Sequence, residues 1–148
     1  MLRILLVDDH LVLRRALRRF LASEYPGARF GEASNARQAV KLLVAGRWDL
    51  VLLDMGLRGS GGLEVLRQVR RRRPGTPALA LSLQPEHLAG LRSLRSGASG
   101  FVAKHSPPEA LVSAVNSVLA GRTYFSPDIA KLRDGGKVKS RAQASGLL

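Results

Sequence analysis

The sequence has no cysteine, which excludes disulfide frameworks, thiolate metal sites and cysteine nucleophiles from its 148 residues. Aromatic residues are also scarce, and no basic stripe is interleaved with aromatic side chains as single-strand nucleic-acid binders require. No apolar run approaches the roughly 20 residues of a membrane helix. The apolar start is too short for a signal peptide and is interrupted by Asp8 and Asp9. We therefore expect a cytoplasmic protein.

Acidic residues are few, and their scarcity gives a formal net charge of +13. Residues 1–121 carry +9 and residues 122–148 carry +4, so the excess is spread along the chain. Such a basic chain can indicate nucleic-acid binding. The alternative, which we favour for the helices, is that arginines line solvated helix faces.

Five short apolar runs alternate with five stretches of helical periodicity. The central runs are continuously apolar, as expected of parallel strands that helices cover on both faces. Strand–helix alternation favours right-handed βαβ units in an open parallel sheet. We predict an α/β, flavodoxin-like (βα)5 fold with strand order 2-1-3-4-5. The runs are residues 4–7, a weaker 28–31 that suits an edge strand, 50–53, 78–81 and 101–103.

The predicted helices have one apolar face each. In the first, Leu13, Leu17 and Leu21 share a stripe at helical spacing. The residues opposite this stripe, which we expect to project to solvent, are Arg14, Arg15, Arg18 and Arg19. The other helical stretches are 36–45, 63–69, one marked by Leu88, Leu91 and Leu94, and 110–119, which Pro107 and Pro108 precede.

Polar residues stand where the predicted strands end. These residues are Asp8 and Asp9, Asp54, Ser82 and Lys104. The strand ends of an open parallel sheet share one rim, and carboxylates gathered there repel one another unless a cation joins them. Oxygen ligands favour a hard ion such as Mg²⁺. One carboxylate can then attack a phosphoryl group while the metal and the lysine neutralise the developing charge.

Each of these residues also has a purely structural explanation. An acidic pair before a helix can cap it, Asp54 and Ser82 can be turn residues, and a lone lysine is usually solvated. Only their occurrence together, each at the end of its own predicted strand, favours a functional site.

Several stretches resemble the receiver domain of two-component response regulators, over about residues 2–128. They are ILLVDDH (residues 4–10), DLVLLD (49–54), GLE (62–64), LS (81–82) and GASGFVAK (97–104). The last of these, together with GRTYFSP (121–127), resembles the NarL/FixJ (LuxR-type) subfamily.

The resemblance implies a role for each residue at the rim. Asp54 matches the phosphoacceptor, and Lys104 matches the lysine that pairs with the phosphoryl group. Ser82 matches the hydroxyl that moves toward it, and Phe101 the aromatic switch residue, although a plain core aromatic is an equal alternative. The implied Mg²⁺ ligands are Asp8, Asp9, Asp54 and the backbone carbonyl of Gly56.

The sequence departs from the family pattern at two positions. Arg58 stands where the family usually has proline, in a loop rich in glycine, so metal affinity is expected to be reduced. His105 follows Lys104 where many receivers have a cis-proline, which leaves the isomer of that peptide open.

These observations predict a receiver domain in residues 1–121, followed at 122–148 by a flexible basic linker or tail where a helix-turn-helix output domain normally follows. The expected partners are a sensor histidine kinase and a second copy in a homodimer. DNA is expected only through an output domain, and no membrane is expected. Two other functions are considered: a nucleic-acid-binding basic protein with a non-functional receiver fold, and an aspartyl-phosphate phosphatase. Gly56 argues against the phosphatase, which needs a second acid at that position.

Overall fold

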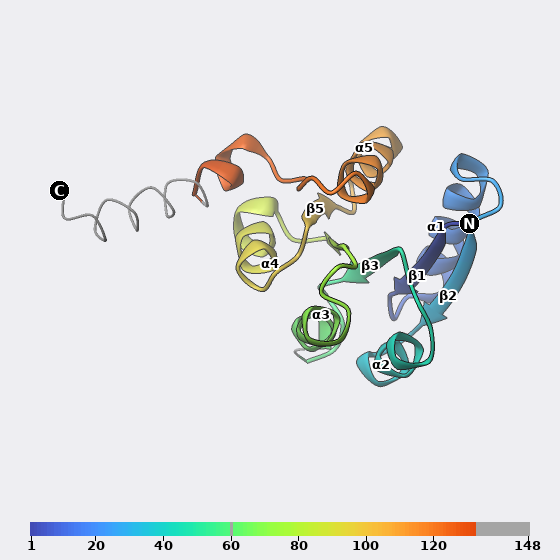
Figure 1. The fold of residues 1–148 in the computed structure, drawn as a ribbon. Helices are drawn as coiled ribbons and strands as arrows, with labels where there is room; N and C mark the ends of the chain where they lie inside the picture. The colour runs from blue at the N-terminus through green and yellow to red at the C-terminus, as the bar shows by residue number, and fades with distance from the viewer. Residues whose placement is uncertain (60, 133–148) are drawn as a thin grey trace.

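The computed structural model describes residues 1–59 and 61–132, and it shows strands alternating with helices (Figure 1). The strands are β1 (Arg3–Val7), β2 (Arg29–Ala33), β3 (Leu50–Asp54), β4 (Ala78–Ser82) and β5 (Gly100–Ala103). The helices are α1 (Leu11–Glu24), α2 (Ala36–Ala45), α3 (Gly61–Arg72), the wide turn η1 (Glu86–Gly90), α4 (Leu91–Arg95) and α5 (Pro108–Leu119).

The strands form one parallel sheet in the order β2-β1-β3-β4-β5, which confirms the predicted α/β, flavodoxin-like topology. β2 lies at an edge, as its weaker apolar pattern indicated, but it runs two residues further than the predicted run. The register pairs Val7 with Leu53 and Asp54 with Leu81, so the carboxyl ends of β1, β3 and β4 lie level.

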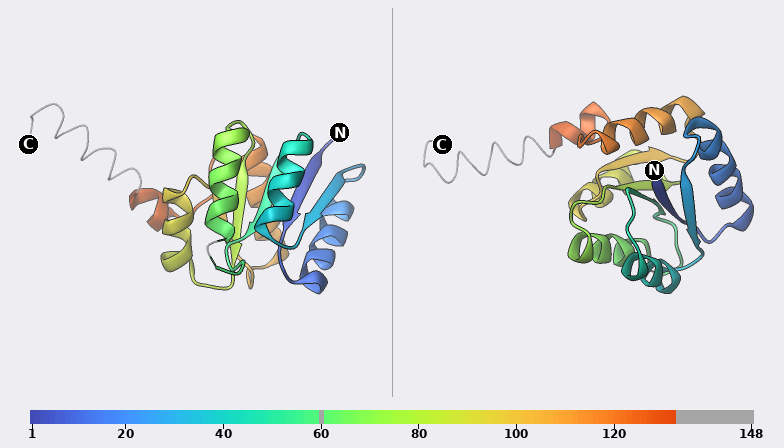
Figure 2. Two further views of the ribbon diagram at one scale, coloured as in Figure 1. Left: turned by 90° about the horizontal axis from the view of Figure 1, so that it is seen from below. Right: turned by 45° about the vertical axis from the view of Figure 1, so that its right-hand side comes forward.

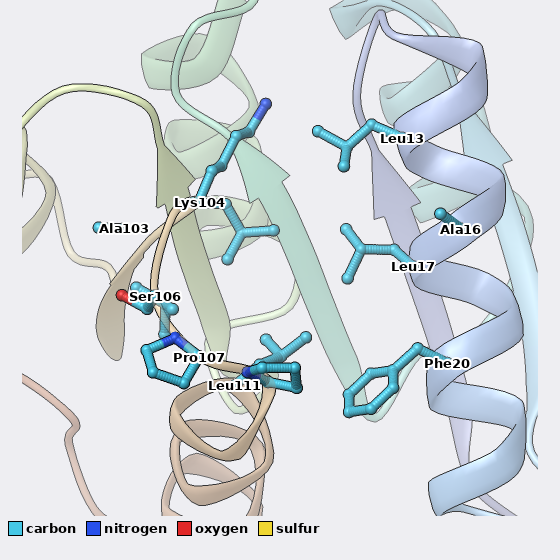
Figure 3. Close-up of a pocket in the computed structure, with 12 residues that line it drawn as sticks. Leu13, Ala16, Leu17, Phe20, Ala103, Lys104, Ser106, Pro107 and Leu111 are labelled. Atoms are coloured by element: carbon cyan, nitrogen blue, oxygen red, sulfur yellow. The ribbon is translucent and has the colours of Figure 1, made fainter.

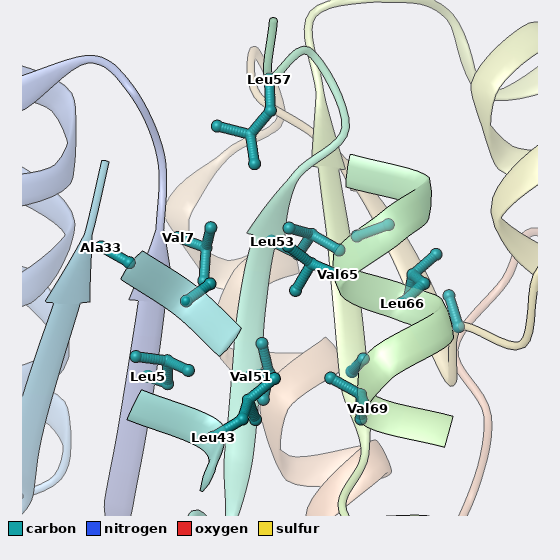
Figure 4. Packing of buried hydrophobic residues seen from close by; sticks show 14 of the residues in the cluster. Leu5, Val7, Ala33, Leu43, Val51, Leu53, Leu57, Val65, Leu66 and Val69 are labelled. Carbon is teal, nitrogen blue, oxygen red and sulfur yellow. The ribbon is translucent and has the colours of Figure 1, made fainter. Parts of the chain in front are cut away.

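Helices cover both faces of the sheet, and each face has its own hydrophobic cluster. On one face, Val65, Leu66 and Val69 of α3 pack with Val51 and Leu53 of β3 (Figure 4). On the other face, apolar residues of α1 and α5 pack against β1, β3, β4 and β5. This burial on both sides explains the unbroken apolar runs, because a polar side chain on either face would lose its water.

The helix before β5 differs from the predicted pattern. Leu88 is exposed, and the residues that face the core are the small ones, among them Ala89, Gly90 and Ser93. The cause is η1, whose wider turn adds one residue and moves the buried face away from the predicted leucine stripe.

The folded part of the chain extends beyond residue 121, where the sequence predicted the receiver domain to end. The backbone of Tyr124 pairs with Ser99 and Phe101 beside β5. Residues 127–132 form a further short helix (Figure 2). Ile129 of this helix is buried. The expected basic tail falls mostly at residues 133–148, outside the described part of the chain. Within the described ranges, no helix is both long enough and apolar enough to cross a bilayer.

Candidate phosphoryl-transfer site

The polar residues predicted at the strand ends do meet at one rim of the sheet. Asp8 follows β1, Asp54 ends β3, and Lys104 follows β5. The lysine ammonium lies between the two carboxylates, with Nζ 3.2 Å from Asp8 Oδ2 and 3.1 Å from Asp54 Oδ1. All three side chains are almost completely buried, at 4%, 2% and 6% exposure for Asp8, Asp54 and Lys104. The lysine is therefore held in the site and is not the solvated side chain of the structural alternative.

The two carboxylate oxygens of Asp54 have different surroundings. Oδ1 accepts the backbone N–H of Gly56 at 2.8 Å and contacts the Lys104 ammonium. Oδ2 is buried and accepts no hydrogen bond. The imidazole Nδ1 of His10 is 3.9 Å from it, which is too far for a hydrogen bond. One oxygen is thus fixed by donors, while the other keeps its lone pairs available toward the rim.

Burial is the main reason that the pKa of Asp54 lies above its usual range, and the nearby Asp8 charge adds to it. The Gly56 N–H and Lys104 act in the opposite direction but do not cancel the effect. The groups around Asp54 therefore do not fully stabilise its ionised form, and a bound cation would stabilise it further.

Asp9 completes the cluster on its open side. Its Oδ1 is buried and accepts no hydrogen bond, although His10 Nδ1 lies 3.2 Å away at an unfavourable angle. Atoms of Asp8, Asp9, His10 and Asp54 lie within 4.8 Å of one another. Buried carboxylate oxygens that accept no hydrogen bond, within a cluster this close, are the arrangement that a hard divalent ion satisfies.

His10 is the residue that sequence reasoning left without a role. Its backbone N–H donates to Asp8 Oδ1 at 2.8 Å, and its ring, 60% exposed, lies over the carboxylates. Its position directly after the acidic pair was the only signal available in the sequence.

Residues 4–116 match the family model for the response regulator receiver domain. The chain belongs to this family. The match places β1 through most of α5 inside the receiver domain and excludes an unrelated fold with a chance cluster of acids.

Relatives of the receiver include transcription regulators. The chain is 37% identical to the response regulator UvrY of Escherichia coli O157:H7 over 88% of its own length and 60% of that protein's. It is 36% identical to BvgA, described as a putative positive transcription regulator of virulence factors in Bordetella pertussis, over 99% of this chain and 70% of BvgA. The chain therefore spans about 60% of the length of UvrY.

Two solved structures extend the comparison. A LuxR-family two-component response regulator from Aurantimonas sp. SI85-9A1 superposes with a TM-score of 0.78 and 37% identity, over 92% of this chain and 97% of that one. The response regulator TrrA from Thermotoga maritima, solved in complex with Mg²⁺-BeF, has a TM-score of 0.69 and 31% identity, over 78% and 97% of the two chains.

Of the two residues expected to switch the receiver, Ser82 lies beside the site, where its carbonyl accepts the Lys104 backbone N–H at 2.7 Å. Ser82 is buried at the end of β4, and its hydroxyl accepts the backbone N–H of Gln84 at 3.0 Å. Phe101 is 3% exposed and belongs to the hydrophobic cluster on the α2 and α3 face. Ser82 is therefore engaged with its own loop in this structure, and Phe101 is packed inward.

The loop after Asp54 is better anchored than its glycines suggest. Leu57 is 4% exposed and packs into the core, and its N–H donates to the Asp54 carbonyl at 3.3 Å. At Gly62 a Cβ would lie 3.0 Å from Met55 Cα, so glycine permits α3 to start close to β3. The described residues contain no cis peptide, so the bond between Lys104 and His105 is trans.

The prediction that all four arginines of α1 face solvent is wrong for Arg14. Its side chain is buried, with Nε 2.9 Å from Glu32 Oε1 and an NH1 group 2.6 Å from the Asp8 carbonyl. Arg18, although exposed, also contacts Glu32, at 2.7 Å. The helix-face argument failed because α1 lies beside the edge strand β2, whose Glu32 provides a partner. Arg15 and Arg19 are exposed as predicted.

Proposed function

We propose that Asp54 accepts a phosphoryl group from the phosphohistidine of a sensor histidine kinase. The observation that carries the proposal is the free Oδ2 of a buried Asp54 whose other oxygen is fixed by Lys104 and Gly56. Oδ2 forms the new P–O bond as the P–N bond of the donor breaks, and the leaving imidazole keeps the electron pair. Lys104 is placed to offset charge on the transferred phosphoryl oxygens.

Mg²⁺ is the proposed cofactor, and Asp8, Asp9 and Asp54 with the carbonyl of Gly56 are its proposed protein ligands. The donor set fits, because its atoms are all oxygens and the buried Asp9 Oδ1 has no hydrogen-bond partner. The ion supplies positive charge to the phosphoryl group when bound. Asp9 is the most accessible of the three acids, at 23% side-chain exposure, and forms the open side of the proposed site.

A titration with Mg²⁺, followed by calorimetry, tests this ligand set. We expect saturable binding in wild type and a loss of at least about tenfold in affinity in Asp9→Ala, because one carboxylate ligand is removed. Arg58→Pro is the matched loop variant and should tighten binding by stiffening the loop. Equal affinity in wild type and Asp9→Ala would remove Asp9 from the site.

The proposed conformational output starts at Ser82. A phosphoryl group on Asp54 offers the Ser82 hydroxyl a stronger acceptor than its present loop, and reaching it requires residues 82–86 to move. That movement leaves space that Phe101 can fill. Glu86, at the end of this loop, accepts the Ser126 N–H at 2.9 Å. A Cβ at position 90 would lie 2.5 Å from Glu86 Cγ, so Gly90 is needed for Glu86 to lie in this direction.

This chain of contacts connects the phosphorylation site to residues 122–132, through which a change can reach a dimer partner or an output domain. The proposed consequence is altered homodimerisation or transcriptional output. DNA recognition is assigned to an output domain, since α1 to α5 are used to cover the sheet. A receiver of this type works in the cytoplasm, where the kinase presents its phosphohistidine.

The kinase is proposed to dock where α1 meets the loop before α5. Leu13, Leu17 and Phe20 of α1 face Pro107 and Leu111 across an apolar groove of about 300 Å³ that also includes Lys104 (Figure 3). Exposed Arg15 and Arg19 lie on the same helix. Their reversal to glutamate should slow phosphotransfer from the kinase and leave phosphorylation by a small donor unchanged. If both rates are unaffected, these arginines are only solvated.

The test of the function itself is incubation with acetyl phosphate followed by intact mass measurement. With Mg²⁺ we expect an adduct of about 80 Da, the mass of one phosphoryl group. With a chelator in place of Mg²⁺ the adduct should fall to background. An adduct of equal yield under both conditions would contradict a metal-dependent reaction, and no adduct under either would contradict the proposed function.

A further inference from the structure

A polar cleft lies at the amino end of the sheet, at the opposite end of β3 from Asp54. It has a volume of about 600 Å³, and it lies between the turn before β3, the turn before β4 and the end of α5. Its charged lining residues are Arg47, Asp49, Arg72 and Arg73. Trp48, the only tryptophan of the chain, also lines it.

The arginines of this cleft, unlike Arg14 and Arg18 of α1, have no acidic partner among the described residues. Among residues 1–59 and 61–132, the ion pairs do not include Arg47, Arg72 or Arg73. Asp49 is the one acid in the lining, and its Oδ2 already accepts the backbone N–H of Arg3 at 2.8 Å.

Arg73 provides the most specific observation. Its Nε is buried and has no hydrogen-bond partner, while its NH2 group makes only a long contact of 3.4 Å with the Gly46 carbonyl. A buried guanidinium N–H without an acceptor is costly, so the Arg73 side chain, which lines the cleft, is stabilised if it turns to donate to an anion there.

The dipole of α3 offers a structural explanation for part of this arginine cluster. Arginines in the last turn of a helix complement its dipole, and Arg70, Arg71 and Arg72 occupy that position in α3. The dipole accounts for these residues but not for Arg47, which is on another turn, or for the unpartnered Nε of Arg73, which follows the helix.

We propose that this cleft binds a small anion that carries two or more phosphate groups. Guanidinium groups donate in pairs to phosphate oxygens. Three of them around one acid match a ligand with several negative charges, and the volume exceeds what a single phosphate fills. The site is separate from the phosphoryl chemistry of Asp54, so either proposal can fail without the other.

The test uses inorganic tripolyphosphate with the full chain, in about 150 mM salt to screen weak surface attraction and with EDTA to prevent Mg²⁺-dependent reaction at Asp54. Binding is measured by calorimetry and by the fluorescence of Trp48, which reports from inside the cleft. We expect saturation at one ligand per chain. Orthophosphate should bind at least about tenfold more weakly, because it engages fewer guanidinium groups. Equal affinity for the two anions, or no saturation, would overturn the proposal.

Variants locate the site. Arg47→Ala and Arg72→Ala should each weaken tripolyphosphate binding about tenfold, the loss expected for a hydrogen-bonded charge. Arg15→Ala and Arg19→Ala remove the same charge from α1 and should change affinity less than about twofold. Arg73→Lys keeps the charge but loses Nε, and it should weaken binding several-fold. Equal losses in the α1 and cleft variants would show general attraction and overturn the site.

Two further ligands, ATP and duplex DNA, test whether the anion is a free polyphosphate, a nucleotide or a nucleic acid. ATP and tripolyphosphate should bind with similar affinity if the phosphates alone are recognised. Binding of ATP without binding of tripolyphosphate would contradict phosphate recognition. Duplex DNA that binds more tightly than both, and equally to the α1 and cleft variants, would replace the proposal with nonspecific nucleic-acid attraction. Thermal melts of each variant verify that the fold is intact.

Discussion

At the carboxyl end of the sheet Asp8, Asp54 and Lys104 are buried and paired, whereas at the amino end the arginines near Trp48 are largely exposed and form no ion pairs within the described residues. The first end has three acids and one buried lysine, and the second has three arginines and one acid. The chain's net charge of +13 is thus unevenly placed. Charge changes at the carboxyl end should therefore alter stability and chemistry, while those at the amino end should alter ligand binding with little effect on stability.

The largest difference in stability between the two ends should appear when a cationic side chain is removed from each. Lys104→Met leaves the buried Asp8 and Asp54 carboxylates without their shared cation, and should destabilise the metal-free protein by about 3 kcal/mol. Arg72→Ala, at the other end, should change stability by less than about 0.5 kcal/mol. Urea unfolding in EDTA measures both. Similar unfolding midpoints for the two variants would contradict the comparison.

Arg14 tests whether removing a buried, paired charge on α1 lowers stability, as we expect at the carboxyl end of the sheet. Arg14→Ala removes its contacts with Glu32 and the Asp8 carbonyl, and should cost about 2 kcal/mol in the free energy of unfolding. Arg15→Ala, one residue away and exposed, is the matched control and should cost less than about 0.5 kcal/mol. An equal cost for both would mean that Arg14 is solvated after all.

The ion pairs of Glu32 should make the stability of the protein depend on pH. Burial raises the pKa of Glu32, but hydrogen bonds from Arg18 and Arg14 outweigh it and hold that pKa below the ordinary 4.5. The stabilisation is therefore present above pH 4.5 and is lost as the pH falls through the lowered value. Glu32→Gln should be less stable than wild type at pH 7, and the difference should shrink at acidic pH. A difference that does not change with pH would contradict the ion pair.

The smallest expected effect is local. Glu86→Ala removes the acceptor of the Ser126 N–H, and should cost about 1 kcal/mol. Hydrogen exchange at residues 124–129 should become faster, while exchange in β1 and β3 should not change. Glu109→Ala, at an exposed position of α5, serves as the control. Unchanged exchange at residues 124–129 would break the proposed connection between η1 and the chain after β5.

The features that depend on periodicity could be predicted from the sequence. The strand order, the sheet and the gathering of Asp8, Asp54 and Lys104 followed from apolar runs that end in polar residues. The features that depend on neighbours distant in sequence could not. The burial of Arg14 depends on Glu32 across β2, and the buried face before β5 depends on the wide turn η1. The Ser82 hydroxyl depends on its loop conformation, for which the sequence holds no signal.

The most direct test of the central claim is which carboxyl group carries the phosphoryl group after reaction with acetyl phosphate and Mg²⁺. Intact mass should show the adduct of about 80 Da in wild type and in Asp49→Asn, which removes an exposed acid at the amino end of the same strand. Asp54→Asn should show none, because the nucleophilic oxygen is gone. An adduct of wild-type yield in Asp54→Asn would contradict the assignment of Asp54 as the phosphoacceptor.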